Sequence, residues 1–275
     1  MCELCDLYGE GQIWYKNPKN YSRELYKRRT KDYERKEYGE DPELEGARYM
    51  FAAIDAKSSA PEEFEELREQ ANEAIRRYSI CQVLPLQDAQ EVMNIASPLV
   101  LMSCICRRSL RARDERSVKD YSCMALGVGG FKWERWPERY KGEVEFVSPE
   151  EAKKWLASWN RKGMVQLIMT AGTPYIGGIC NCDYDCMALK IRLEYDIDFV
   201  LKGQYVAMVD HEKCTGCGTC LQRCQFGAIR KNVTLNNVWI DPFKCFGCGL
   251  CETGCPQGAI TLKDRRHLPG LAEVW

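Results

Sequence analysis

Two copies of one cysteine pattern, offset by 31 residues, lie near the C-terminal end of this chain of 275 residues. Each copy has three cysteines at intervals of three and a fourth cysteine four residues later: Cys214, Cys217, Cys220 and Cys224, then Cys245, Cys248, Cys251 and Cys255. Deprotonated thiols are the ligands that iron takes in iron–sulfur clusters, and two intervening residues let the chain curl so that successive sulfurs reach neighbouring irons. Packing residues rarely recur in such a doubled register, so the pattern predicts two [4Fe–4S] clusters.

The two copies also agree at glycines. Gly216 and Gly218 of the first copy recur as Gly247 and Gly249 in the second. Because glycine has no Cβ, these positions allow tight turns and a close approach of backbone N–H groups to a cluster. A zinc ribbon is the alternative, but its two CxxC pairs would leave the third and fourth cysteine of each run unexplained.

With these residues, the C-terminal segment resembles bacterial two-cluster ferredoxins. The resemblance implies two ligand sets, in each of which the fourth cysteine comes from the other copy: Cys214, Cys217, Cys220 and Cys255, and Cys245, Cys248, Cys251 and Cys224. The proline expected after the fourth cysteine is present as Pro256, but Gln225 replaces it in the first copy. We expect this departure to affect local rigidity and reduction potential rather than ligation.

Nine further cysteines lie upstream. Cys81 has apolar neighbours and is interpreted as a core residue. The other eight could bind one or two more [4Fe–4S] clusters: Cys2, Cys5, Cys104, Cys106, Cys123, Cys180, Cys182 and Cys186. Alternatively, several of them pack as small apolar residues, and a terminal CxxC could be a redox dithiol or half of a zinc site.

Local geometry bears on two pairs of these cysteines. Cys104 and Cys106 would point to the same side of a strand ending at Ile105, because side chains alternate along a strand. Cys182 and Cys186 would share a face if that stretch is helical. Both pairs could then present two thiols to one cluster.

Four short motifs carry the upstream cysteines: Met1-Cys2-Glu3-Leu4-Cys5, Cys104-Ile105-Cys106-Arg107, Cys123-Met124 and Ile179-Cys180-Asn181-Cys182. Together they resemble a group of iron–sulfur proteins of anaerobes, in which such a cysteine domain precedes a two-cluster ferredoxin module. Relatives often carry further adjacent cysteines where this chain has Asp183, Tyr184 and Asp185, so the ligands of the last motif stay open. The resemblance implies an electron carrier or a redox subunit.

Three helices and two strands are predicted upstream of the ferredoxin-like segment. Apolar residues at helical spacing predict a helix from Pro61 and a second one that Asp88 caps and that stops at Ser97-Pro98. The third helix has a capping box formed by Ser148 and Glu151 and ends at Gly163. The strands are predicted at 99–105 and 164–170, and the charged stretch 16–40 is interpreted as a solvated helix or arm.

Beyond about residue 200 the predicted elements become short strands around the cysteine loops, at 205–209, 228–231, 238–241 and 259–262. The fold class is therefore α+β, with a mostly helical, cysteine-rich N-terminal domain (1–200) that is expected to carry additional clusters, and a pseudo-twofold ferredoxin-like domain (201–275). The prior of one domain per 100 to 200 residues is consistent with two domains.

Composition excludes several classes of protein. The net charge of −1 gives no field for nucleic acid, and only two histidines are present, which argues against a Cys₂His₂ zinc framework. The start of the chain shows no signal peptide, and the apolar run at 96–106 is too short to span a membrane. We therefore expect a cytoplasmic protein whose thiols are held for metal rather than for disulfides.

Other motifs are weaker. Arg107, Arg108, Arg111, Arg113 and Arg116 could offset the negative charge of a cluster or form a compensated surface helix. Gly127 to Gly130 lacks the rest of a phosphate-binding loop and is interpreted as an ordinary loop. Trp133, Trp136, Trp155 and Trp159 are expected to form an aromatic core. No acid/base dyad and no catalytic residue is identified.

These observations favour an electron-transfer iron–sulfur protein, a carrier or relay subunit of a larger anaerobic oxidoreductase. Its expected partner is a redox protein, either a flavoprotein or a larger iron–sulfur oxidoreductase. The alternative is an iron–sulfur enzyme whose N-terminal cluster binds substrate and is fed by the ferredoxin module. An incomplete set of thiolate ligands at that cluster would favour the enzyme, and four thiolates would favour the relay.

Overall fold

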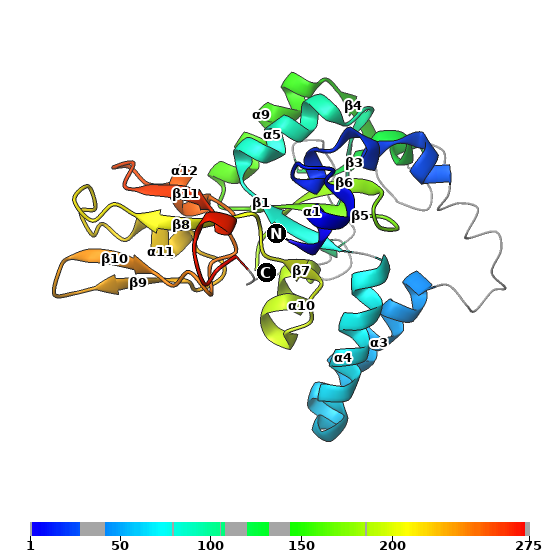
Figure 1. Ribbon diagram of the computed structural model, residues 1–275, viewed down its shortest axis with the longest axis horizontal. Coiled ribbons are helices and arrows are strands. Elements are labelled where there is room, and N and C mark those ends of the chain that lie inside the picture. The colour runs from blue at the N-terminus through cyan, green and yellow to red at the C-terminus, as the bar shows by residue number, and fades with distance from the viewer. Residues whose placement is uncertain are drawn as a thin grey trace.

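A sheet of seven strands organises the N-terminal part of the computed structural model, which describes residues 2–27, 42–78, 80–104, 106–107, 120–131, 144–184 and 186–272 (Figure 1). The strand order is β4-β2-β3-β6-β5-β1-β7, and all neighbours are antiparallel except β1 and β7. The strands are β1 Cys81–Leu84, β2 Leu99–Met102, β3 Cys123–Leu126, β4 Val144–Val147, β5 Val165–Thr170, β6 Ile176–Cys182 and β7 Val200–Leu201. The sheet was not foreseen, since only two of its strands were predicted.

Helices cover one face of this sheet. Helices α5 (Leu86–Ile95) and α9 (Pro149–Arg161) pack against each other and against β5. Alternation along the strands directs Ile168 and Ile179 to this side, where they share a core with α5 and α9, and directs Leu167 to the opposite side. Cys180 pairs with Leu167 in the register of β5 and β6, so the strand presents this thiol on the face away from the helices.

Two of the predicted helices have the expected starts. Helix α4 runs over Pro61–Tyr78, as predicted. At the start of α9 the Ser148 side chain accepts a hydrogen bond from Glu151 N, and the Glu151 side chain accepts one from Ser148 N, which confirms the capping box. Gly163 follows the helix with a φ of +85°, which favours glycine at this position.

Asp88 does not cap α5, so that prediction is wrong. The helix begins at Leu86, directly after Pro85, and Asp88 lies inside its first turn. Its buried carboxylate accepts hydrogen bonds from Tyr15 Oη at 2.6 Å and Tyr205 Oη at 3.0 Å. Asp88 therefore joins three distant segments of the chain rather than starting a helix.

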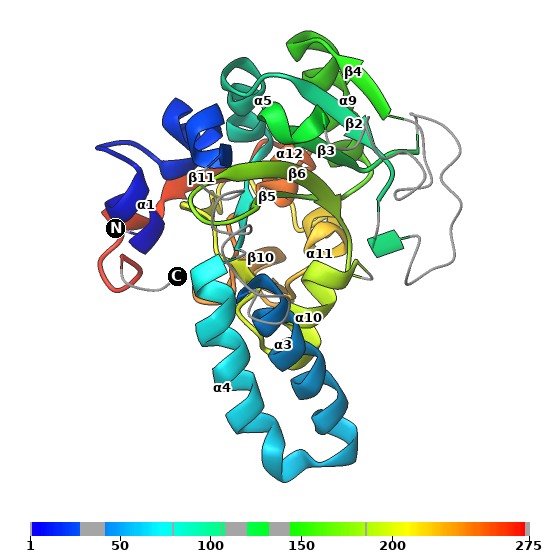
Figure 2. The same ribbon diagram turned by 90° about the vertical axis from the view of Figure 1, so that its right-hand side faces the viewer.

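A helical hairpin projects from the sheet (Figure 2). Helix α3 (Pro42–Ser59) packs along α4, and Ala71 and Ile75 of α4 share a small core with Ile191 of α10 (Met187–Tyr195). In the arm predicted at 16–40, short helical turns at Trp14–Lys16 and Pro18–Tyr21 lie against the body, following α1 (Glu3–Tyr8). Residues 28–40 of that stretch lie outside the described residues.

The C-terminal part has the predicted pseudo-twofold arrangement. Its strands lie within two residues of the predicted positions: β8 Tyr205–Val209, β9 Ile229–Asn232, β10 Asn237–Ile240 and β11 Ile260–Asp264. β8 pairs with β11 and β9 with β10, both antiparallel. Two short helices, α11 (Thr219–Arg223) and α12 (Leu250–Thr253), carry the third cysteine of each copy.

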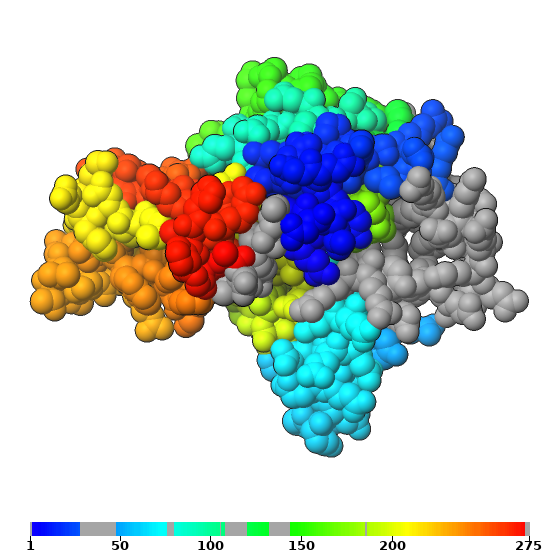
Figure 3. Space-filling model, in the orientation of Figure 1, coloured from blue at the N-terminus to red at the C-terminus, as the bar shows by residue number. Residues whose placement is uncertain are grey.

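The two parts of the chain pack against each other, and the C-terminal part forms the lobe at the left of Figure 3. One apolar core contains Leu189 and Val200 from the N-terminal side together with Phe246 and Leu250 from the C-terminal side. Gly203 lies in the connection, where an added Cβ would come within 2.5 Å of Val83 O. The connection at about residue 200 is therefore tightly packed rather than an extended linker.

Candidate iron–sulfur sites

The two cysteine loops have matching backbone contacts, and each loop is hydrogen-bonded to the segment that follows the fourth cysteine of the other copy. Asp210 Oδ1 accepts hydrogen bonds from the backbone N–H groups of Glu212 and Lys213, and Asp241 repeats these contacts in the second copy. Asp210 N donates to Ala259 O, and Asp241 N donates to Ala228 O, both at 2.8 Å. Because Ala228 and Ala259 each follow the fourth cysteine of their own copy by four residues, these bonds bring each fourth cysteine to the opposite loop.

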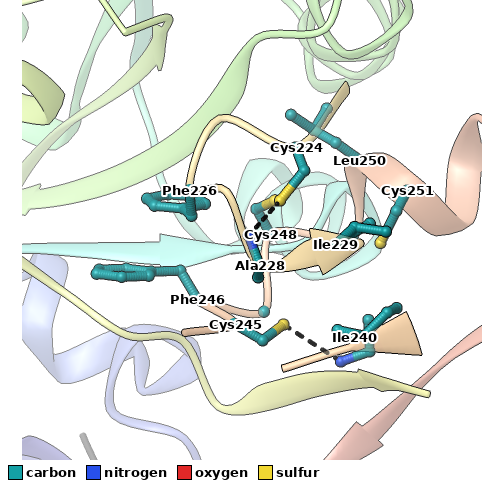
Figure 4. Close-up of a pocket in the computed structure, with 13 residues that line it drawn as sticks. Cys224, Phe226, Ala228, Ile229, Ile240, Cys245, Phe246, Cys248, Leu250 and Cys251 are labelled. Atoms are coloured by element: carbon teal, nitrogen blue, oxygen red, sulfur yellow. Dashed lines mark hydrogen bonds between the residues drawn. The ribbon is translucent and has the colours of Figure 1, made fainter. Parts of the chain in front are cut away.

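One cavity is accordingly lined by Cys224 together with three cysteines of the second copy, Cys245, Cys248 and Cys251 (Figure 4). Its empty space is about 340 Å³, and the rest of the lining is apolar side chains and glycine. Phe226 and Phe246 stack beside it with ring centroids 4.1 Å apart. We call this cavity the inner site, because Cys245, Cys248 and Cys251 are each only 8% exposed.

A second cavity is lined by Cys214, Cys217, Cys220 and Cys255, the last from the second copy. Its empty space is about 310 Å³. Cys217 is exposed, whereas Cys214 and Cys255 are partly buried. We call this cavity the outer site, since one of its thiols reaches solvent.

The glycines next to the cysteines are required by close backbone contacts. Gly216 and Gly247 have φ values of +67° and +75°, and an added Cβ would lie 2.2 Å from Asn236 O and 2.1 Å from Tyr205 O, respectively. Neither position accommodates a side chain. The matching glycines predicted from the sequence therefore have a steric reason in both copies.

Backbone N–H groups point at the sulfurs. Ala228 N lies 3.3 Å from Cys224 Sγ, and Ala207 N lies 3.4 Å from Cys245 Sγ. Ala259 N makes the matching contact with Cys255 Sγ at 3.3 Å. Such donors stabilise negative charge on a thiolate and help to set the potential of a cluster bound there.

The donor set fits [4Fe–4S] clusters better than single ions. Within the described ranges, no three thiol, imidazole or carboxylate side chains are arranged around one metal ion. Instead, four thiols surround each cavity, as a cluster wider than an ion requires. Burial raises the pKa of Cys248 to about 12 and that of Cys251 further, so the inner thiolates need the positive charge of iron to form at neutral pH.

Arg265 was not identified from the sequence, yet it is fully buried beside the inner site. Its guanidinium donates to Cys245 O at 2.8 Å, to Tyr205 O at 3.1 Å and to Gly203 O at 3.4 Å. It thereby joins the first strand of the C-terminal part to the loop that carries Cys245.

We predict that Arg265→Leu lowers the free energy of unfolding by about 3 kcal/mol, because three buried carbonyls lose their donor. Arg266→Leu is the matched control, since it removes a more exposed neighbour whose ion pair with Asp264 contributes less than about 1 kcal/mol. Anaerobic urea unfolding with the clusters loaded measures both values. Equal losses in the two variants would contradict the structural role of Arg265.

The N-terminal part contains a second group of neighbouring thiols. Six thiols lie in a series of neighbours, in the order Cys106, Cys104, Cys123, Cys180, Cys182 and Cys186, and Cys180 packs against two apolar cores that contain the other five. The neighbouring thiols of Cys106 and Cys123 lower the pKa of Cys104 to about 2, and those of Cys123 and Cys182 lower the pKa of Cys180 to about 5. The tertiary structure thus brings together cysteines from three separate motifs.

The strand geometry predicted for Cys104 and Cys106 is wrong, and the helical condition stated for Cys182 and Cys186 is not met. Strand β2 ends at Met102, so Cys104 follows the strand and Cys106 lies in a helical turn. Cys182 is the last residue of β6, and Cys186 precedes α10, so no helix contains both. Loops after the strands, rather than one strand or helix face, bring the members of each pair together.

Arg107 is buried next to these thiols. Its backbone N–H donates to Cys104 Sγ at 3.4 Å, its positive charge interacts with Cys186, and its guanidinium lies 5.0 Å from the centroid of the Trp159 ring. The positive charge predicted near this site is therefore present at Arg107. Arg108, Arg111, Arg113 and Arg116 lie outside the described residues.

The predicted aromatic core is confirmed at Trp155 and Trp159, whose indole N–H groups both donate to Tyr121 O at 2.9 Å. The other two predicted members, Trp133 and Trp136, lie outside the described residues, as does Asp185. Gly127–Gly129 forms a short 3-10 helix rather than the irregular loop expected there.

Cys2 and Cys5 lie apart from the six thiols. Their sulfurs are 3.0 Å from each other, and both side chains are 3% exposed. Their other polar neighbours are the amides of Gln82 and Gln204, at 3.9 Å and 3.8 Å. Cys81 is buried in an apolar core, as predicted.

Comparison with known proteins covers only the C-terminal part. No curated protein matches the chain significantly. No described helix is long and apolar enough to cross a membrane. Residues 207–262 match the family model of the 4Fe-4S dicluster domain, so this segment, which holds both cavities, is a two-cluster ferredoxin-type domain.

Proposed function

We propose that the protein is an electron carrier or relay with two [4Fe–4S] clusters in its C-terminal domain. The outer cluster would be held by Cys214, Cys217, Cys220 and Cys255, and the inner one by Cys224, Cys245, Cys248 and Cys251. The observation that carries this proposal is the pair of cavities, each lined by four cysteines from both copies. Bound clusters supply one-electron chemistry, while the protein positions them and tunes their potentials.

A third [4Fe–4S] cluster is proposed in the N-terminal part, held by four of the six thiols Cys104, Cys106, Cys123, Cys180, Cys182 and Cys186. Their packing in two cores that share Cys180 supports it, because unrelated core cysteines would not converge from three motifs. The separate pair formed by Cys2 and Cys5 favours one further cluster over two, since two thiols alone do not complete a four-ligand site.

The proposal also includes the cellular compartment and the redox partner. All seventeen cysteines are free thiols, which supports a reducing, cytoplasmic compartment of an anaerobe. The redox partner is then a flavoprotein or a larger iron–sulfur oxidoreductase, of which this chain is a carrier or a subunit. The likeness of the N-terminal motifs to anaerobe iron–sulfur proteins supports the same setting.

One observation favours the second candidate, an enzyme with a substrate-binding cluster. At the end of the thiol series, Cys186 Sγ lies 3.3 Å from Asp183 Oδ1 and contacts Arg107, so two groups other than cysteine are available there. A carboxylate ligand would leave an exchangeable position on the cluster. Mössbauer spectra of the oxidised protein distinguish the two cases, because one distinct iron indicates incomplete thiolate ligation.

We predict that the chain alone accepts about three electrons from a low-potential donor, one for each cluster, and then turns over no small molecule. A carrier has no substrate to convert, so electrons should leave only to a partner protein. Anaerobic reductive titration, followed by assays for consumption of candidate acceptors, measures both properties. Catalytic consumption of a small acceptor would overturn the carrier in favour of the enzyme.

A further inference from the structure

The two copies of the cysteine pattern differ at the residues that flank the fourth cysteine. Arg223 and Gln225 flank Cys224, whereas Gly254 and Pro256 stand at the equivalent positions around Cys255. The glycine has a packing reason, since a Cβ at Gly254 would lie 2.3 Å from the Arg223 side chain. The internal symmetry is therefore broken around one ligand of the inner site.

Both unusual side chains contact the N-terminal part. Arg223 Nη2 donates to Asn160 O at 2.8 Å, at the end of α9. Gln225 Nε2 donates to Gly163 O at 3.1 Å, and Gln225 Oε1 accepts from Tyr184 N at 3.2 Å. Pro256, by contrast, is exposed. Among the described residues, the first copy alone meets the N-terminal part at this position, which accounts for its departure from proline.

The loop that Gln225 contacts carries thiols of the N-terminal site. Tyr184 lies between Cys182 and Cys186, and both cysteines share one apolar core with Cys248 of the inner site. Phe226, which stacks on Phe246 at the inner site, packs against the same core. Gln225 thus connects the backbone next to Cys224 to the backbone next to Cys186.

A series of side-chain hydrogen bonds, buried except at the Thr253 end, makes a parallel connection. Thr253 Oγ1 donates to Asn160 Oδ1, Asn160 Nδ2 to Gln166 Oε1, and Gln166 Nε2 to Asn181 Oδ1, at 2.8, 3.1 and 2.9 Å. Thr253 lies between Cys251 and Cys255, and Asn181 lies between Cys180 and Cys182. Satisfied networks with a buried amide part fix one geometry, so the two thiol sites are held in a defined relation.

We propose that Gln225 is a positioning residue that holds the N-terminal thiol site against the inner site, and that this contact is the internal junction through which electrons pass between the two parts of the chain. The proposal rests on the proposed function, since it requires an N-terminal cluster. One electron leaves one site and arrives at the other, and no bond forms or breaks. The outer site, with its exposed Cys217, is then the end that exchanges electrons with the partner.

Gln225→Pro tests the junction with little change to the domain itself. Cys224 has φ −81° and ψ 97°, an extended conformation that a following proline tolerates. Within the described residues the backbone N–H of Gln225 donates no hydrogen bond that proline would remove. Gln225→Ala removes the same side-chain contacts without constraining the backbone, and Pro256→Gln is the matched control on the exposed copy.

We expect wild-type protein to bind about twelve irons and to show magnetic interaction between the N-terminal and inner clusters in its reduced EPR spectrum. Gln225→Pro and Gln225→Ala should keep the iron, weaken that interaction, and speed hydrogen exchange at the Tyr184 amide about tenfold, since this amide loses its acceptor. Pro256→Gln should match wild type in all three measurements.

Two outcomes contradict the proposal and differ from each other. If wild-type protein binds about eight irons, the N-terminal cluster is absent. That result contradicts both this part of the proposed function and the proposed electron-transfer contact at Gln225. If it binds about twelve and both Gln225 variants keep the wild-type EPR spectrum, the third cluster stands and the positioning role of Gln225 is overturned.

Discussion

Cys224→Ala is expected to damage the inner cluster, although Cys224 belongs to the first cysteine run. The hydrogen bond from Asp241 N to Ala228 O brings the chain after Cys224 to the second loop, and Cys224 lines the inner cavity with Cys245, Cys248 and Cys251. With three thiolates left, the site should lose between about one and four irons. Iron analysis and the EPR spectrum of anaerobically purified protein measure the loss.

Cys255→Ala is the matched variant, because Cys255 lines the outer cavity with Cys214, Cys217 and Cys220. It should spare the inner cluster and affect the outer one. The two clusters can be told apart by reactivity, since the outer site has the exposed thiol. If Cys224→Ala affected only the outer cluster, the crossed ligand sets would be wrong.

The joint substitution of Cys123 and Cys180 by alanine should remove the proposed N-terminal cluster. These residues face each other in the register of β3 and β6 and lie at the middle of the thiol series. Iron should fall from about twelve to about eight per chain, while the signals of the C-terminal clusters remain. The full chain is needed for this test, because the core around Cys182 and Cys186 includes Phe246 and Leu250, which a fragment ending near residue 200 would lack.

Joint substitution of Cys2 and Cys5 by serine is the control for that experiment. Their sulfurs contact each other and two amides, and lie apart from the six thiols. Iron content should therefore stay at the wild-type value. A loss of about four irons in this variant would assign Cys2 and Cys5 to a cluster after all.

Local sequence was sufficient to predict the C-terminal domain. Spacing of the cysteines, the paired glycines and the short strands all arise from contacts within about sixty residues, and the structure reproduces them closely. The start of α9 was predictable for the same reason, because a capping box joins Ser148 to a residue only three positions away. The prediction that Asp88 caps a helix was wrong because the sequence does not distinguish a carboxylate that caps a helix from one that accepts a buried tertiary hydrogen bond.

The sequence alone determined which cysteines form the repeated C-terminal pattern and which kind of cluster that pattern binds. Which of the upstream cysteines lie close to one another was decided by the tertiary structure. Cys104, Cys123 and Cys180 come from segments up to 76 positions apart, and the pairing of β3 with β6 and the turn after β2 bring them together. Gln225 appeared in the sequence only as a missing proline, and its two partners lie about 40 and 60 residues away. Contacts at such distances depend on how the whole chain packs, so local patterns do not encode them.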